Sequence, residues 1–376
     1  MIARANRVIE RLVTLLSCVG LLATGAAGEL KVIKFRSSYD GKEQKAELFV
    51  PSAHDGTKKL PLLAFLPYMG GSMTSARGVG HHETGERLGW LVVCPELHGL
   101  NTAGESSFGA VPAQHDVIDA IRFVQEHYQV DEKRIYSDGR SMGGLLSLLV
   151  AAKYPHVFAA AMAGQPPTDF SIQGEKPFPE ILFKEFGGTR AQRPFEYSRR
   201  EPITYARNLK YTPVMIWHGT LDQVVPVEHS KRIYALLKKY NPYQYPVYWL
   251  EGAGHNSINY GSEWVCEKLR WYQKTKCRFT ADLDFVLDES GRFMWMTLEQ
   301  EEKCKYSSVT SSLREKELTI SCSNVRRLTL DMKPFGDRKP TAIRLKCDAS
   351  LTLEIQGVRG KPVMKKIKGQ ARVRLP

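Results

Sequence analysis

The order of apolar and polar residues divides the chain into two parts. Between residues 32 and 274, short apolar runs alternate with longer stretches in which apolar residues recur every three or four positions. This alternation predicts a mostly parallel sheet flanked by helices. After residue 277, short runs of alternating apolar and polar residues are separated by Gly, Pro, Asp, Asn and Ser. The second part therefore predicts a small antiparallel β-domain, either a sandwich or a partial barrel.

The elements of both parts can be placed along the chain. In the first part we expect an antiparallel strand pair at 31–38 and 46–51, further strands at 60–67, 89–96, 133–139, 158–164, 212–219 and 245–252, and helices at 113–128, 141–154, 227–239 and 259–274. In the second part we expect strands at 279–288, 292–299, 317–322, 325–332, 342–347, 351–356 and 365–375. A Pro-rich, polar and aromatic stretch at 165–211 interrupts the series. Inserts of that length are more often functional than idle, so we expect a cap or insertion there.

The first residues follow a different pattern. Arg4, Arg7 and Arg11 precede an apolar run at 12–27 that ends in small residues. This order is typical of a secretory signal peptide, and the run is short for a membrane-spanning helix. We expect residues 1–28 to be a signal peptide cleaved near Ala27 and the mature protein to be secreted or periplasmic. An uncleaved membrane anchor is the alternative.

Cysteine content adds to this picture. Beyond the expected signal peptide there are six cysteines, at 94, 266, 277, 304, 322 and 347. Cys94 lies within an apolar run, which favours a buried thiol, whereas the other five allow one or two disulfides in an exported protein. The chain has no CxxC pair, so we expect no structural zinc site.

The formal net charge is +13, and residues 357–376 contain seven Lys or Arg and no acidic residue. This basic end is either a solvated strand and tail or a contact for an anionic polymer or surface. Aromatic residues are not interleaved with its basic ones, so we expect no nucleic-acid partner.

Candidate chemistry begins with a serine between glycines. In "YSDGRSMGG" (136–144), Ser141 stands in a G-x-S-x-G motif at the end of an expected strand and the start of an expected helix. A sharp strand-to-helix turn of this kind exposes a nucleophilic serine, and it needs small neighbours such as Gly139 and Gly143. The position therefore predicts a nucleophile, with a structural serine in a Gly-rich turn as the alternative.

A serine hydroxyl needs a base, and the base needs an orienting acid. Asp222 follows the strand at 212–219 and His255 follows the strand at 245–252. Because parallel strands end at one edge of a sheet, we expect Ser141, Asp222 and His255 to meet there. Alternatives remain for the two partners. For the acid, Asp222 could instead cap the following helix, and Asp169 would then be the acid. For the base, the alternatives to His255 are His98, His115, His218 and His229, of which His218 is expected to be a hydrogen-bonded structural histidine at a strand end.

The reaction also needs donors for an oxyanion. We expect one to be the backbone N–H of Met142, and the other to be the N–H of Tyr68 or Met69, with the Tyr68 hydroxyl as a further candidate. A plain Gly-Gly turn is the alternative for this second loop. The pair His81 and His82 has too few acidic or Cys neighbours to suggest a metal site. We expect no cofactor.

With these residues placed, the sequence resembles the α/β-hydrolase superfamily. Within it, the chain is similar to secreted esterases of the polyhydroxybutyrate-depolymerase and feruloyl-esterase type and to the catalytic domain of prolyl oligopeptidases. The segments 115–166, 200–230 and 251–257 carry the resemblance, which extends over about residues 32–274. It implies an α/β-hydrolase fold for that region, whereas the small all-β domain after it is expected from the sequence pattern alone.

The same resemblance implies roles for the three residues: Ser141 is acylated, His255 shuttles its proton, and Asp222 orients His255. Three features depart from the pattern, and the first is that the β-domain after residue 277 has no counterpart that we can name in these families. Pro67 and Tyr68 stand where relatives have His-Gly, and only a short strand pair precedes the core, where prolyl oligopeptidases have a large propeller. A size-gated proline-specific peptidase is therefore not expected.

The sequence thus predicts three domains: the signal peptide at 1–28, an α/β-hydrolase catalytic domain at 29–276 with its insertion at 165–211, and a β-rich domain with a basic tail at 277–376. The leading hypothesis is a secreted serine hydrolase that cleaves carboxylic esters through an acyl-enzyme, and whether the ester is polymeric is left open. A prolyl-oligopeptidase-like serine peptidase is the first alternative. A non-catalytic protein of the same fold that binds a polymer or surface is the second, and the oligomeric state is left open.

Overall fold

The computed structural model describes residues 28–98, 108–172, 178–240, 246–255, 261–272, 280–358 and 362–375. The expected signal peptide, apart from its last position, lies outside the described residues. Within the described ranges, no helix combines the length and the apolar character needed to span a bilayer.

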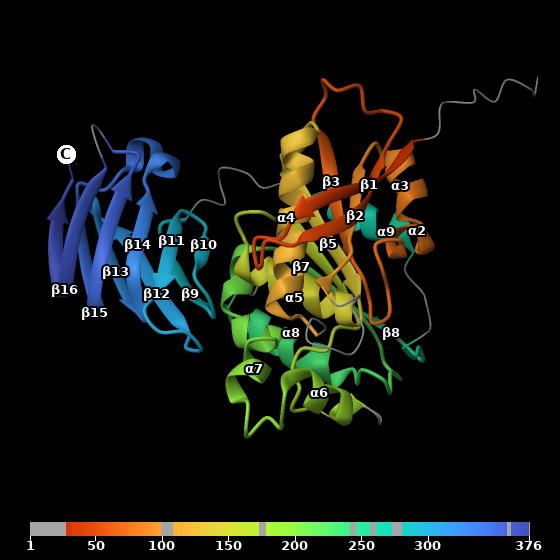
Figure 1. Cartoon of the computed structure of the whole chain (residues 1–376). Helices are drawn as coiled ribbons and strands as arrows, with labels where there is room; N and C mark the ends of the chain where they lie inside the picture. The colour runs from red at the N-terminus through yellow and green to blue at the C-terminus, as the bar shows by residue number, and fades with distance from the viewer. Residues whose placement is uncertain are drawn as a thin grey trace, which may run out of the picture.

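The first part of the chain builds an eight-stranded sheet in the order β1-β2-β4-β3-β5-β6-β7-β8 (Figure 1). Its strands are β1 (Glu29–Arg36), β2 (Glu43–Val50), β3 (Leu60–Leu66), β4 (Leu91–Pro95), β5 (Val130–Arg140), β6 (Ala160–Gly164), β7 (Val214–Gly219) and β8 (Val247–Leu250). The β1–β2 and β2–β4 pairs are antiparallel, and the other pairs are parallel. The expected mostly parallel sheet is confirmed.

Helices cover both faces of this sheet (Figure 1). One face carries α4 (Val111–His127), α5 (Met142–Lys153) and α8 (Glu228–Tyr240); the other carries α2 (Ser75–Gly78), α3 (His81–Leu88) and α9 (Ser262–Leu269). Successive residues of a strand point to opposite faces, so Leu62 packs on the α4 side and Leu63 on the α9 side. Every residue of α5 is buried, as its almost wholly apolar sequence predicts.

The insertion at 165–211 contains short helices that the sequence pattern did not indicate. They are α6 (Phe178–Phe186), α7 (Pro194–Ser198), η2 (Pro202–Tyr205) and η3 (Asn208–Tyr211). Phe170, Phe186 and Tyr197 from this segment form an aromatic cluster with Phe108. The insertion is therefore a packed structure whose aromatic residues join the apolar core of the catalytic domain around α5.

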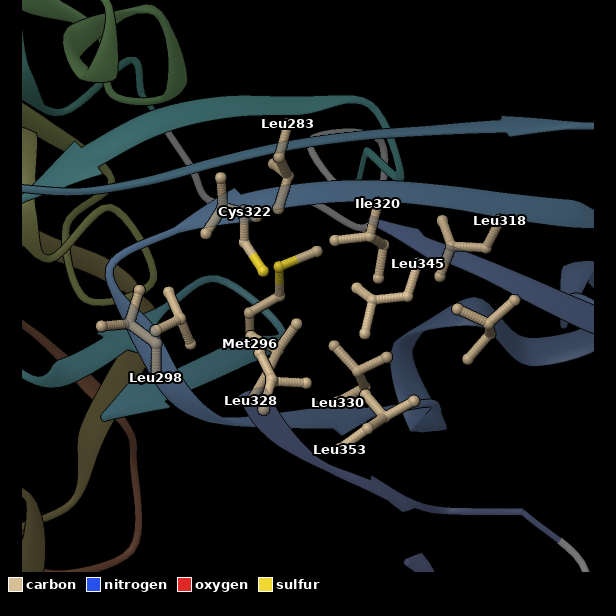
Figure 2. Packing of buried hydrophobic residues seen from close by; sticks show 14 of the residues in the cluster. Leu283, Met296, Leu298, Leu318, Ile320, Cys322, Leu328, Leu330, Leu345 and Leu353 are labelled. Atoms are coloured by element: carbon tan, nitrogen blue, oxygen red, sulfur yellow. The ribbon is translucent and has the colours of Figure 1, made fainter. Parts of the chain in front are cut away.

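The second part of the chain builds another eight-stranded sheet around one apolar core (Figure 1). Its strands are β9 (Leu283–Leu287), β10 (Gly291–Phe293), β11 (Met296–Gln300), β12 (Ser307–Arg314), β13 (Glu317–Ser323), β14 (Val325–Asp331), β15 (Ala342–Gln356) and β16 (Val363–Arg374), with η5 (Lys333–Arg338) before β15. Alternate residues turn inward, and Leu318, Ile320 and Leu345 meet Leu328 and Leu353 in the core (Figure 2). The expected all-β domain is confirmed.

The prediction of a purely antiparallel domain is wrong, because β15 runs parallel to both β13 and β14. Glu317 pairs with Ala342 and Arg327 with Thr352, so both pairings keep the same register. β13 and β14 thus lie in line beside one long strand, separated at Asn324, whose φ of 56° is left-handed. The crossover through η5 makes this parallel arrangement possible. The two runs expected at 342–347 and 351–356 are one strand, and β12 was not predicted.

The described cysteines form no disulfides with one another, so the one or two bridges that the sequence allowed do not occur among them. Cys94, Cys266, Cys322 and Cys347 are buried thiols and Cys304 is an exposed one, whereas Cys277 lies outside the described residues. Cys322 and Cys347 face each other across β13 and β15 and fill part of the domain core. The buried thiol predicted for Cys94 is confirmed.

We predict that acid destabilises the fold through a buried histidine. The Nδ1 atom of His229 accepts hydrogen bonds from the backbone N–H groups of Thr168 (3.1 Å) and Asp169 (3.3 Å). Burial lowers the pKa of His229 from 6.5 to about 4, so between these values the unfolded chain binds a proton that the folded chain does not. The midpoint of thermal unfolding should therefore fall as the pH is lowered through this interval.

The matched variant is His229→Asn, whose amide oxygen can accept the same two bonds but does not titrate. It should reduce the loss of unfolding free energy across the interval by on the order of 3 kcal/mol. His82, whose pKa burial also lowers to about 4, supplies a remaining slope. An identical pH profile in the parent and the variant would contradict the assignment to His229.

Candidate active site

Ser141 occupies a strained turn between a strand and a helix. β5 ends at Arg140, α5 begins at Met142, and Ser141 between them has φ 53° and ψ −122°. Such a conformation costs a non-glycine residue on the order of 1–3 kcal/mol. Two backbone bonds hold it in place: Ser141 N–H donates to the Gly164 carbonyl (2.7 Å), and Leu145 N–H donates to the Ser141 carbonyl (3.0 Å).

The glycines around this serine are required by close backbone approach. A Cβ atom on Gly139 would collide with the backbone of Gly143. A Cβ atom on Gly143 would collide with the carbonyl of Leu66, at the end of β3. The helix can start this close to the sheet only because these side chains are missing, and the turn then lifts the Ser141 hydroxyl above the strand ends.

The structure brings the three predicted residues together. His255 Nε2 lies 3.1 Å from Ser141 Oγ, and His255 Nδ1 lies 2.7 Å from Asp222 Oδ2. With the proton on Nδ1, the imidazole donates to the carboxylate and accepts from the serine hydroxyl. The side chain of His255 is only 15% exposed and that of Asp222 is fully buried. The constellation can therefore remove the proton of Ser141 and stabilise the imidazolium that results.

Asp222 is held as an anion by its hydrogen bonds. Burial alone would raise its pKa, but hydrogen bonds from His218, His255 and the N–H of Val225 (2.8 Å) hold the pKa of Asp222 well below its ordinary value. It does not cap a helix, since α8 begins only at Glu228. The alternative acid, Asp169, instead forms an ion pair with Arg232 at 2.9 Å.

Gln165 is a site residue that the sequence reasoning missed. It follows β6 directly, has φ 46°, and is buried. Its side-chain amide donates to Asp222 Oδ2 (2.9 Å) and to the Gly254 carbonyl (3.2 Å), so it ties the acid to the loop that carries His255. The one available signal was its place after the strand next to β7, because parallel strands end at a common edge.

The candidate oxyanion donors lie on two backbones near Ser141. Met142 N–H is the first of α5 and Met69 N–H follows β3, and neither has a hydrogen-bond acceptor among the described residues. The Tyr68 carbonyl accepts from Gly71 N–H at 2.8 Å, which closes a tight turn around Met69. The Met69 and Met142 side chains pack in one apolar cluster. This arrangement favours Met142 and Met69 as the proposed donors over Tyr68.

The other candidate histidines have structural partners. His218 bonds Ser230 Oγ (2.7 Å) and donates to the Val225 carbonyl (2.8 Å), as predicted for a satisfied strand-end histidine. His98 is bound by Asp116 at 2.7 Å and His115 lies 3.3 Å from Glu289. None of these contacts Ser141, and neither does His229.

A second Ser-His-Asp set lies between the central strand β5 and the helices α3 and α9. His81 Nε2 is 2.9 Å from Asp138, and its Nδ1 bonds the Ser262 hydroxyl. All three side chains are buried, so substrate cannot reach this serine. Over the described ranges, no group of three or more His, Cys, Asp or Glu is placed to hold a metal ion.

Known proteins resemble the first part of the chain. Residues 92–276 match the model of the prolyl oligopeptidase family. The chain is 29% identical over 154 residues to the protein named "Uncharacterized peptidase YtmA" of Bacillus subtilis. The aligned region covers 40% of this chain and 59% of that protein. It is 22% identical over 220 residues to feruloyl esterase B of Talaromyces stipitatus. That aligned region covers 54% of this chain and 59% of the enzyme.

Among solved structures, a puromycin-hydrolyzing peptidase of Mycobacterium tuberculosis superimposes with a TM-score of 0.54 at 20% identity, covering 67% of this chain and 39% of the other. A puromycin hydrolase gives a TM-score of 0.53 at 19% identity, covering 65% and 38%. The chain thus spans under two thirds of the length of each of these relatives. Its first sheet, with the helices around it, has the α/β-hydrolase fold, and a β-rich domain follows.

We predict that Gln165 supports the reactivity of Ser141 through Asp222. Gln165→Leu removes a hydrogen bond to a buried carboxylate, and such a bond is worth about 1.5–3 kcal/mol. The rate at which a small fluorophosphonate labels Ser141 should therefore fall about 10- to 100-fold. The control is Gln192→Leu, because Gln192 is an exposed residue whose amide oxygen accepts bonds from Thr189. Unchanged labelling in a folded Gln165→Leu variant would remove Gln165 from the site.

Proposed function

We propose that this chain, which belongs to the serine hydrolases of the α/β-hydrolase superfamily and matches the prolyl oligopeptidase family over residues 92–276, hydrolyses carboxylic esters. The hydrogen-bonded set of Ser141, His255 and Asp222 is the observation that carries the proposal. It supplies a nucleophile, a base and an orienting anion without any cofactor.

The proposed reaction proceeds in two halves. His255 takes the proton of Ser141 as the oxygen attacks the ester carbonyl, and the N–H groups of Met142 and Met69 receive the developing oxyanion. His255 then gives the proton to the leaving alcohol, which leaves an acyl group on Ser141. In the second half, His255 activates water, which releases the acid and restores the serine.

Apolar side chains on the flanking loops support an ester substrate. Leu221, next to Asp222, is 65% exposed, and Val224 is 40% exposed on the same loop. Tyr68 is 39% exposed beside Met69. An apolar acyl or aryl group would cover such side chains. The similarity to a feruloyl esterase, over 54% of this chain, is consistent with this substrate class.

A serine peptidase is the second candidate, because residues 92–276 match a peptidase family and another relative is named a peptidase. The same three residues would act on an amide, but the leaving amine must then be protonated by His255 more completely than an alcohol. A non-catalytic polymer-binding protein is the third candidate. The sequence-based proposals of export, and of an anionic polymer against the basic strand β16, are compatible with each candidate.

We predict that a fluorophosphonate forms a single adduct on Ser141. Peptide mapping by mass spectrometry should find the adduct on Ser141 and not on Ser262, which belongs to the buried Ser-His-Asp set. Ser141→Ala should abolish labelling and leave thermal unfolding intact. A folded parent protein without an adduct would favour the non-catalytic candidate.

The substrate class is tested with matched pairs that share one acyl group. Aryl and alkyl esters, including esters of hydroxycinnamic acids, are compared with aminoacyl and peptidyl anilides. We expect ester turnover that depends on Ser141 and little or no anilide turnover. Faster cleavage of the anilides would replace the esterase proposal by the peptidase.

A further inference from the structure

A buried ion cluster joins the β-domain to the helix that begins behind Ser141. Asp288 follows β9 in the β-domain, and its side chain is fully buried. It lies 2.6 Å from Nζ of Lys153, the last residue of α5, and 2.9 Å from Nε of Arg199 in the insertion. The Lys153 side chain is 2% exposed. One β-domain carboxylate therefore meets two cations from two different segments of the catalytic domain.

These charges depend on one another. An unpaired ammonium in the interior is costly, and removing one partner of a buried ion pair is strongly destabilising. The Lys153 ammonium also lies 4.7 Å from the centre of the Tyr205 ring, in the insertion. The catalytic domain thus buries a lysine whose counter-ion comes from the β-domain.

The hydrogen bonds that β9 forms with the catalytic domain go to the same insertion. The Asn208 side chain bonds both backbone groups of Val286, donating to its carbonyl (2.8 Å) and accepting from its N–H (3.0 Å). The Tyr211 hydroxyl accepts from Asp284 N–H at 2.7 Å. Side chains of the insertion therefore hydrogen-bond the backbone groups along the free edge of β9, as a neighbouring strand would.

Tyr306, just before β12, extends the contact. Its hydroxyl lies 2.7 Å from the Ser198 hydroxyl, and its ring packs near Phe195 and Tyr205. Most partners on the catalytic side thus fall within residues 195–211, at the end of the insertion. Lys153 of α5 and His115 of α4, which lies 3.3 Å from Glu289, complete the contact.

From this docking surface, packing continues to the active site. Val286 and Tyr306 pack against the apolar cluster that contains Phe186 and Tyr197 of the insertion. The same cluster contains Met142, and Met69 packs on it. Phe108, in contact with Phe186, also donates its N–H to the sulfur of Met142 at 3.1 Å. The β-domain therefore packs against the aromatic cluster of Phe108, Phe170, Phe186 and Tyr197, here called the aromatic wall. Through Phe108, this wall contacts Met142, one of the proposed oxyanion donors.

We propose that the β-domain is a positioning element of the active site: Asp288 and β9 hold the insertion in the place where its aromatic wall shapes the space beside Ser141. The triad itself is held by the strands of the first sheet and by Gln165. Loss of the Asp288 contacts should therefore alter which groups fit beside Ser141 more than it alters the reactivity of Ser141.

The test compares two phosphonate probes of Ser141, a small dialkyl fluorophosphonate and a bulky aryl phosphonate. Asp288→Asn removes the anion, and the matched control is Asp284→Asn, whose half-exposed carboxylate pairs with Arg207 and Lys210 at 3.4 and 3.6 Å. In Asp288→Asn we expect the labelling rate with the bulky probe to change about tenfold or more relative to the small probe. Asp284→Asn should keep the ratio of the parent.

Tyr306→Phe provides a second variant, because it removes the bond to Ser198 and retains the ring, and the ratio should shift in the same direction. The inference is wrong if the ratio of the two labelling rates stays that of the parent in Tyr306→Phe and in a folded Asp288→Asn. It is also wrong if both labelling rates fall by the same factor. This inference rests on the proposed function only because it takes Ser141 as the nucleophile. No labelling of the parent refutes that function, whereas parental labelling with an unchanged ratio refutes the inference alone.

Discussion

The strained backbone of Ser141 is the constraint on which the rest of the site depends. A non-glycine residue with φ 53° between β5 and α5 is maintained only because the neighbouring strands and the helix leave it no alternative. The close approach of Gly143 to Leu66 determines where α5 starts, and the Gly164 carbonyl holds the Ser141 amide. With the serine placed in this way, the ends of β7 and β8 bring Asp222 and His255 within hydrogen-bonding distance. The catalytic geometry is thus a consequence of parallel strands ending at one edge.

This dependence explains what could be predicted from the sequence. Ser141, Asp222 and His255 each follow a recognisable apolar strand. The strand pattern, the G-x-S-x-G motif and the need of a serine for a base and an acid therefore placed them together at a common edge. Gln165 also follows a strand, but a glutamine has no chemistry that would single it out before its partner Asp222 is located in space. Met69 emerged as the better proposed donor than Tyr68 only once the turn closed by Gly71 was visible.

The fold beyond the first sheet was less predictable for physical reasons. β12, "SSVTSSLR", is rich in serine, and its apolar residues are too few for period two to stand out. The parallel pairing of β15 depends on the break at Asn324 and on the crossover through η5, which are tertiary features. Asp288 reads in sequence as one more polar residue at a strand end. Its burial against Lys153 and Arg199 depends on two segments far from it in the chain.

The position of Asp288 along the chain also has a consequence for biosynthesis. Domains generally fold in order as they are synthesised, and α5 is complete long before residue 288 has been made. Until then, the Lys153 ammonium lacks the counter-ion that the β-domain supplies, so its burial is costly. Closure of the catalytic domain around the end of α5 is therefore favoured only once β9 has been made, which links the folding of the first domain to the translation of the second.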